Sequence, residues 1–342
     1  MSNNEIDVVL LWVDSEDKEW KKNYETYSPQ EISTENHPCR FRAWDNLEYI
    51  FRGIETFMPW VRKVHFVTQG HLPRWLNKGS ESLNILTHND IFGIHKHLPT
   101  FNSNAIEVNF NNIKGLSENF ILFNDDFFIL NKVAEERFFV NNLPVDFLVQ
   151  GFKRKGALYK LLKPRNSSNA KSINNNIDYI NTYYKKNRLN AKFYFSSNYS
   201  VTSKLSNYFY NALSNEVPWL KLNHVPQPHL KSTLDNAWKL RPDLLNSTSS
   251  HKFRSELDTT QYLFRYINLI TGDFYPYEYK DYLSREINSS SNMEEVLTEL
   301  SGINLLSVSD TEKLNSIEFE KSKVILKKYL NEILPKKSAF EI

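Results

Sequence analysis

Two residue types are scarce in this chain of 342 residues, which has one Cys, Cys39, and nine Gly. One cysteine excludes an internal disulfide and a zinc site built from cysteines, and it fits a reducing compartment. The few glycines form no stretch that resembles a Gly-rich phosphate cradle. Cys39 itself is expected to be structural.

Charge of one sign and long apolar runs are also lacking. The net charge is +2 and charged residues make up 24%, so we expect no polyanion, and thus no nucleic acid, as partner. No stretch approaches the roughly 20 apolar residues of a membrane span, and the N-terminus lacks the basic region of a signal peptide. These absences predict a cytoplasmic protein.

The first 150 residues alternate between strand-like and helix-like stretches. A helix is predicted over 46–58, where apolar side chains recur at helical spacing and Pro59 follows. Continuous apolar runs predict strands over 6–14, 63–70, 83–90 and 120–126. This alternation predicts an α/β fold with a mostly parallel sheet for the first half of the chain, residues 1–150.

Residues 151–342 are expected to form a largely helical half that belongs to the same folded unit. A polar loop or lid is predicted over 161–176, and helices over 177–187, 198–213, from Ser255 onward, and 315–334.

Polar residues follow the predicted strands at their carboxyl ends. They are Asp14, Thr68-Gln69, His88-Asn89-Asp90 and Asn124-Asp125-Asp126. Ligands of parallel α/β sheets bind beyond these strand ends, so the four clusters predict one pocket. Asp125 and Asp126 suit a hard divalent cation, which takes oxygen ligands and is shared with substrate phosphates. The alternative is that one aspartate caps the turn and the other is solvated.

Two segments of the second half carry titratable residues. "HVPQPHLKS" (224–232) holds His224 and His229 among prolines, where a rigidly held His is a candidate general base or phosphate contact. "HKFR" (251–254) precedes a predicted helix and is a candidate anion site. An ordinary surface loop and a solvated charged face remain the alternatives.

Long stretches resemble the Stealth family of sugar-1-phosphate transferases, in the family's order. "IDVVLLWVD" (6–14) resembles its first block, and the second block is matched by 41–77 and by "LPTFNSNAIEVNFNNIKGLSENFILFNDDFFI" (98–129). The segments 224–232 and 251–266 resemble the third block. A degraded fourth block is found at 303–314, where Asp310 is retained.

The resemblance implies a fold and a reaction. Members resemble glycosyltransferases of the A-type fold, with a Rossmann-type sheet. By this resemblance, residues 1–150 would be the nucleotide-sugar-binding half, and residues 151–342 would complete the active site of one catalytic unit. They transfer hexose-1-phosphate or HexNAc-1-phosphate from a UDP-sugar to a saccharide hydroxyl, form a phosphodiester and release UMP. An oligosaccharide, polysaccharide or lipid-linked saccharide of the bacterial surface would be the acceptor. The alternative is a metal-dependent glycosyltransferase of similar fold that releases UDP.

The resemblance also implies site residues. Asp125 and Asp126 would bind Mg²⁺ or Mn²⁺, Arg254 would clamp phosphate, and His229 would be the general base, with His224 as the alternative. Arg42 and Arg52 are phosphate contacts or ion-pair partners of Asp45 and Glu55. The substrate-binding candidates are Asp14, Arg42, Asn46, Asn104, Glu107, Asn124 and Asp258.

Some positions depart from the family pattern. Asn109, Asn111 and Asn112 stand in a region where many relatives carry His and Arg, and Gln69 stands where Asp or Asn is commoner. Ser309 precedes Asp310 where Asn is usual. These differences do not change the reaction type that the resemblance implies. They weaken any inference from the resemblance about which sugar is transferred.

A C-terminal helix has an apolar face surrounded by lysines. The face comprises Leu326, Tyr329, Leu330, Ile333 and Leu334. It would either pack on the core of the enzyme or rest weakly on an anionic membrane at the inner face of the cell membrane.

Overall fold

The computed structural model describes residues 5–28, 41–156, 159, 161, 168–186, 189–311 and 313–342. Cys39 and residues 162–167 of the predicted loop lie outside the described residues.

A five-stranded sheet in the order β3-β2-β1-β4-β8 forms the centre. Its strands are β1 (Ile6–Leu11), β2 (Lys63–Thr68), β3 (Leu83–Thr87), β4 (Asn119–Phe123) and β8 (Gln227–Leu230). β1 to β4 are parallel, and β8 joins the edge antiparallel to β4. The predicted α/β class with a mostly parallel sheet is confirmed.

Two smaller sheets of three strands each have the orders β10-β11-β5 and β6-β7-β9. Their strands are β5 (Phe127–Ile129), β6 (Phe139–Val140), β7 (Leu143–Asp146), β9 (Tyr275–Pro276), β10 (Tyr282–Ile287) and β11 (Leu305–Asp310). Because β8 and β11 come from the second half, residues after 150 supply strands to the sheets as well as helices.

The helices of the first half are α1 (Lys18–Tyr27), α2 (Leu47–Phe57), α3 (His88–Ile91) and α4 (Ser103–Glu107), with the 3₁₀ turns η3 (His95–His97), η4 (Phe110–Asn112) and η5 (Glu135–Arg137). The second half begins with the helices α6 (Ser168–Tyr183), α7 (Ala191–Tyr194), α8 (Val201–Leu213) and α9 (Lys231–Leu240). They are followed by α10 (Pro242–Ser250), α11 (Tyr262–Thr271), α12 (Ser290–Thr298) and α13 (Ser316–Ile333).

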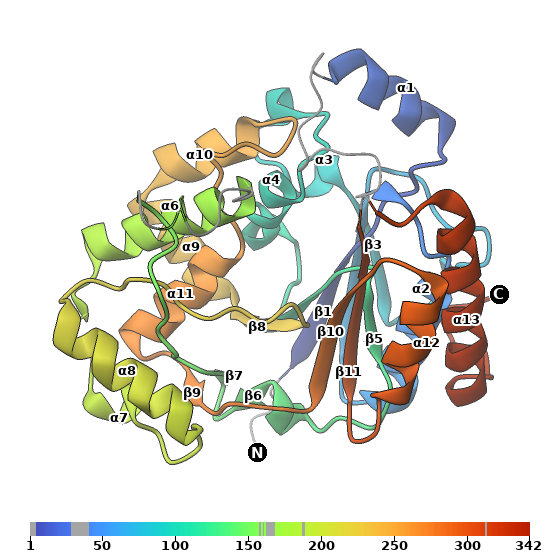
Figure 1. The fold of residues 1–342 in the computed structure, drawn as a ribbon. Coiled ribbons are helices and arrows are strands. Elements are labelled where there is room, and N and C mark those ends of the chain that lie inside the picture. Colours follow the sequence, from blue (N-terminus) through green and yellow to red (C-terminus); the bar gives the residue numbers. More distant parts are fainter. Residues whose placement is uncertain are drawn as a thin grey trace.

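Helices cover both faces of the central sheet because successive strand side chains point to opposite faces. Val8 and Leu10 of β1 pack with α2, α12 and α13, whereas Val9 packs with α4, α6, α9 and α11. Figure 1 shows these two groups of helices on opposite sides of β1. A strand buried on both faces reads as a continuous apolar run, which is why β1 and β4 were recognisable.

A buried charge cluster fixes the amino end of β1. The carboxylate of Asp7 accepts hydrogen bonds from Arg62 Nε (2.8 Å) and the Ser117 N–H (2.8 Å), and its Oδ2 lies 2.9 Å from His65 Nε2. Burial alone would raise the pKa of Asp7, but the bonds from His65, Arg62 and Ser117 outweigh it and lower the pKa to about 2.

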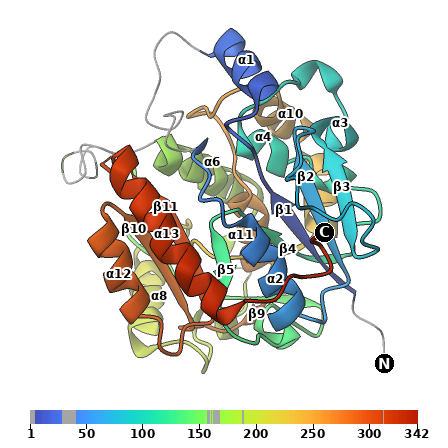
Figure 2. The ribbon, with the colours of Figure 1, turned by 90° about the vertical axis from the view of Figure 1, so that its right-hand side faces the viewer.

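Helix α13 packs on the core. Leu326, Leu330 and Leu334 are 0%, 0% and 3% exposed, so the apolar face is covered by the protein itself. Of the two alternatives for this helix, packing on the core is therefore confirmed, and Figure 2 shows α13 beside α12. The tail beyond it returns to α2, where Glu341 accepts two hydrogen bonds from the Arg52 guanidinium, at 2.8 and 2.7 Å.

Two other predicted boundaries move. Residues 168–176 belong to α6 and not to a loop, because Ala170, Ile173 and Ile177 are buried at helical spacing. The helix predicted from Ser255 begins only at Tyr262. The intervening segment turns instead, and the Ser255 N–H donates to the Asp258 carboxylate at 3.0 Å.

Candidate active site

A cavity of about 740 Å³ lies at the carboxyl ends of the central strands. Trp12 after β1, Gln69 after β2 and Asn124 after β4 line it, together with His88 after β3. Four strand ends therefore meet at one pocket, and three of the four predicted polar clusters contribute to it, whereas the residue predicted after β1, Asp14, does not line it. The volume suits a nucleotide-sized ligand. Thr68, Asn89 and Asp90 of those clusters are not among the lining residues.

An acidic group forms one wall. Asp125 and Asp126 occupy the turn between β4 and β5, and Asp310 ends β11. The pairing of β11 with β5, extended by the bond from the Val308 N–H to the Asp126 carbonyl (3.1 Å), brings Asp310 to this turn. Burial, together with the negative charges of Asp126 and Asp310, raises the pKa of Asp125 to about 7.

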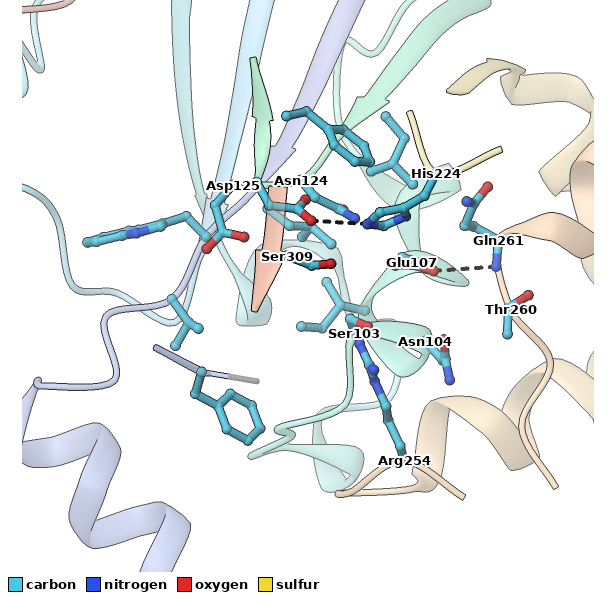
Figure 3. Close-up of a pocket in the computed structure, with 18 of the residues that line it drawn as sticks. Ser103, Asn104, Glu107, Asn124, Asp125, His224, Arg254, Thr260, Gln261 and Ser309 are labelled. Carbon is cyan, nitrogen blue, oxygen red and sulfur yellow. Dashed lines mark hydrogen bonds and ion pairs between the residues drawn. The ribbon is translucent and has the colours of Figure 1, made fainter. Parts of the chain in front are cut away.

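His224 lies against this group. Its Nε2 is 3.0 Å from Asp126 Oδ2, and its ring packs edge-on against Phe127 with centroids 4.9 Å apart. Enclosure by the cavity opposes the charged imidazole, but the adjacent Asp126 carboxylate outweighs this and raises the pKa of His224. Figure 3 shows His224 directed into the cavity from the segment before β8.

Arg254 enters from the opposite wall (Figure 3), where its Nη2 donates to Ser103 Oγ at 2.8 Å. Glu107 of α4 is buried nearby and accepts a bond from the Gln261 N–H at 3.4 Å. Burial raises the pKa of Glu107 to about 7, although the Arg254 charge acts in the opposite direction. The wall therefore brings a cation close to a buried carboxyl group whose pKa is raised.

Arg42 lines the cavity, but its predicted partner changes. Its Nε lies 2.6 Å from Asp310 Oδ2, and its Nη1 donates to the Leu314 carbonyl at 2.9 Å. It therefore pairs with Asp310 and not with Asp45, and this pair brings Asp310 into the site. Arg52 does not line the cavity. Its guanidinium donates hydrogen bonds to the Glu341 carboxylate and to the Leu334 carbonyl.

The structure does not bring His229 to the cavity wall. His229 lies within β8, is 2% exposed, and stacks on Phe120 with ring centroids 5.4 Å apart. Its Nε2 is 2.9 Å from Gln261 Oε1, and burial lowers its pKa to about 4. Of the two histidines considered, His224 is the one that reaches the cavity.

Three other candidates also lie behind or away from the lining. Asp258 is fully buried and holds the site together, because its carboxylate accepts bonds from Asn102 (2.9 Å) and Asn104 (3.1 Å). Asn46 lies at the N-cap position of α2, is 1% exposed, and makes no side-chain hydrogen bond to the helix. Asp14 lies beyond the lining and accepts a bond from the Glu16 N–H at 2.9 Å. Asn104 itself lines the cavity.

Gln261 was missed by the sequence analysis. It lines the cavity, contacts His229 through its side chain and Glu107 through its N–H. It lies seven positions after Arg254, inside the third block, but an isolated Gln carries no chemical signal that would single it out.

A divalent cation would find partial ligation here. Among the described residues, no group of three or more His, Cys, Asp or Glu is arranged to hold a metal ion. Asp126 Oδ1 is nevertheless buried and lacks a hydrogen-bond partner in the described chain. This free oxygen, with the carboxylate of Asp125 next to it in the chain, fits Mg²⁺, which commonly takes one or two carboxylates and completes its shell with substrate phosphates and water.

Comparison with known proteins decides the family. Residues 40–146 match the model of Stealth protein CR2, conserved region 2. The chain is 32% identical to the capsular polysaccharide phosphotransferase WcwK of Streptococcus pneumoniae, over 100% of this chain and 99% of the relative. The chain belongs to the Stealth family.

A second relative has a name that indicates the same class of enzyme. The exopolysaccharide phosphotransferase cps2G of Lactiplantibacillus plantarum is 29% identical over 98% of this chain and 96% of the relative. The names of these relatives confirm the predicted enzyme class, a phosphotransferase. Among solved structures, mouse xyloside xylosyltransferase 1 in its apo form matches 89% of this chain and 97% of that chain. Its identity is 9% and its TM-score 0.33, a likeness that supports no conclusion about function.

Proposed function

We propose that this Stealth protein transfers hexose-1-phosphate or HexNAc-1-phosphate from a UDP-sugar to a hydroxyl of a saccharide, with release of UMP. The observation that carries the proposal is the meeting of Asp125, Asp126, His224 and Arg254 in one cavity. Relatives named capsular and exopolysaccharide phosphotransferases support sugar-phosphate transfer in polysaccharide synthesis. The acceptor would be an oligosaccharide, polysaccharide or lipid-linked saccharide.

The reaction requires charge neutralisation and one proton transfer. The acceptor oxygen forms a bond to the β-phosphorus, and the bond from that phosphorus to the bridging oxygen breaks, so UMP leaves with the electron pair. His224 accepts the hydroxyl proton, and its contact with Asp126 orients the ring and stabilises the imidazolium. Arg254 neutralises the phosphoryl oxygens as their charge grows.

The base therefore shifts from His229 to His224 in this proposal. A general base must come within hydrogen-bond reach of the proton that it removes. His229 lies behind Gln261 and holds it against the cavity, which is a positioning role.

Mg²⁺ or Mn²⁺ is proposed as the cofactor, held by Asp125 and Asp126. When bound, it would neutralise the diphosphate of the donor. Titration of the purified protein with Mn²⁺ tests this without any substrate. Asp125→Asn combined with Asp126→Asn should abolish binding, whereas Asp243→Asn, at an exposed carboxylate on α10, should leave it intact.

Product analysis tests the reaction itself. The protein is incubated with a panel of UDP-sugars and saccharide acceptors, and UMP and UDP are separated chromatographically. UMP released together with a phosphodiester supports the proposal, and Asp126→Ala should abolish it. UDP release with a glycosidic product would establish the glycosyltransferase alternative instead. We propose that the reaction takes place in the cytoplasm at the inner face of the cell membrane, where such acceptors are built.

A further inference from the structure

Helix α8 (Val201–Leu213) is amphipathic, but its polar face packs against the protein and its apolar face points to solvent. Asn207 is 0% exposed, and its Nδ2 donates to the Leu148 and Tyr194 carbonyls, both at 2.8 Å. Ser206 Oγ donates to the Gln150 carbonyl at 2.7 Å. These side chains satisfy backbone groups of the neighbouring segments, so the inward direction of this face is specified.

The outer face of α8 is apolar and open to solvent. Its members and their exposed fractions are Val201 (71%), Leu205 (62%), Tyr208 (68%), Phe209 (55%) and Leu213 (62%). They recur every three or four positions and so form one stripe along the helix. Phe195, just after α7, adds an aromatic ring that is 40% exposed.

A buried lysine fixes the C-terminal end of α8. Lys186 Nζ donates to the carbonyls of Tyr210 (3.0 Å), Ser214 (2.9 Å) and Glu216 (3.3 Å). A cation at this end also suits the helix dipole. Rotating the apolar stripe inward would break these bonds and those of Asn207, so the stripe stays exposed in the folded protein.

The surroundings of the stripe are basic. Apart from the buried Lys186, residues 183–216 contain three Lys and one Arg but only one acidic residue, Glu216. Lys185 and Lys192 are exposed. Glu278 also contacts α8, and its carboxylate accepts hydrogen bonds from the Ser200 N–H (2.9 Å) and from Ser203 Oγ (2.8 Å). The combination of aromatic, aliphatic and lysine side chains suits the interface of a bilayer that contains anionic lipid.

We propose that α8 and the adjacent lysines bind the surface of an anionic phospholipid bilayer. Across the described helices, none is both long and apolar enough to cross a membrane, so the contact would be peripheral. In Figures 1 and 2, α8 lies at the opposite end of the molecule from α1, whose Trp20 lines the cavity. A bilayer under α8 therefore leaves α1 and the cavity wall that it forms on the side away from the lipid. This surface is independent of the reaction proposed above.

Vesicle flotation tests the proposal on the full chain. Vesicles of phosphatidylglycerol with phosphatidylcholine are compared with pure phosphatidylcholine, at low and high salt. The wild type should float with the anionic vesicles and less so at high salt. Leu205→Gln with Phe209→Gln should lower the partition coefficient about tenfold or more, since two large apolar side chains are lost from the contact.

The matched control lies on α13, where Ile317 and Val324 are 70% and 68% exposed. Ile317→Gln with Val324→Gln should leave flotation unchanged. Lys185→Glu with Lys192→Glu retains the apolar stripe and should weaken binding to anionic vesicles alone. Far-UV circular dichroism and thermal melting verify that each variant is folded.

Three results would overturn the proposal. The first is a wild type that stays off anionic vesicles at low salt. The second is equal flotation of the wild type and the folded Leu205→Gln, Phe209→Gln variant. The third is a wild-type dimer, seen by sedimentation velocity, that this variant converts to monomer while vesicles bind neither form. That last result would assign the stripe to a second copy of the chain.

Discussion

Replacing Asp7 by Asn should remove a pH-dependent part of the stability of the central sheet. Asp7 is 0% exposed, and its pKa is lowered from 3.8 to about 2 in the folded protein. Its contribution is therefore complete above the unfolded-state pKa of 3.8 and is lost as the pH falls toward 2. At about 1.4 kcal/mol per pKa unit, the pH-dependent part is about 2 kcal/mol, of which about 1 kcal/mol is lost by pH 3.

Urea unfolding of the wild type and Asp7→Asn between pH 6 and pH 3 measures this term. Asn does not titrate, so the difference in unfolding free energy between the two proteins should shrink by about 1 kcal/mol over that range. Glu16→Gln, which removes an exposed ion pair with Lys21, should cost under about 0.5 kcal/mol with little pH dependence. A difference for Asp7→Asn that stays constant down to pH 3 would refute the reasoning.

Three further predictions concern the site and the C-terminal tail. His224→Ala should lower kcat about 100-fold or more with little change in UDP-sugar affinity, whereas His229→Ala should act mainly on thermal stability; the reverse pattern in steady-state kinetics would return the base to His229. Arg254→Lys should raise KM and lower kcat for the donor, because the ammonium of lysine cannot form the two parallel hydrogen bonds that a planar guanidinium makes to phosphate. Wild-type kinetics for this variant would contradict a phosphate-binding role of Arg254. Arg52→Ala should lower the free energy of unfolding by about 3 kcal/mol or more in chemical denaturation, because the buried Glu341 carboxylate loses its only cationic partner in the described chain and retains bonds from Ser338. A loss below about 1 kcal/mol would contradict this.

The strands and the acidic turn were predictable because their signals are local. A run such as Ile6–Leu11 is buried on both faces, and the polar residues that follow such runs meet at one sheet edge. β8 was not predicted, because Pro226 and Pro228 indicated a loop. An edge strand tolerates proline, and β8 lies at the edge of its sheet. That strand buries His229 and leaves His224 before it in the cavity.

The amphipathic helices show what periodicity leaves undecided. An apolar stripe on α13 and one on α8 are equivalent as sequence patterns, yet the first is buried and the second exposed. The difference arises from the contacts of the opposite, polar face of α8. Ser206 and Asn207 donate hydrogen bonds to the backbone carbonyls of Gln150 and Leu148, which lie some 60 residues away in sequence. Such long-range partners cannot be read from helical spacing.

The bond between Arg52 and Glu341 has a consequence for folding during synthesis. The two residues are 289 positions apart, so at a translation rate of 5–20 residues per second α2 emerges roughly 15 to 60 s before its partner exists. For that interval the Arg52 side chain has no carboxylate to neutralise it at the site where the finished protein buries it. The first half of the sheet is therefore expected to stay loosely packed on the ribosome and to become fully packed only after Glu341 has been synthesised and released from the exit tunnel.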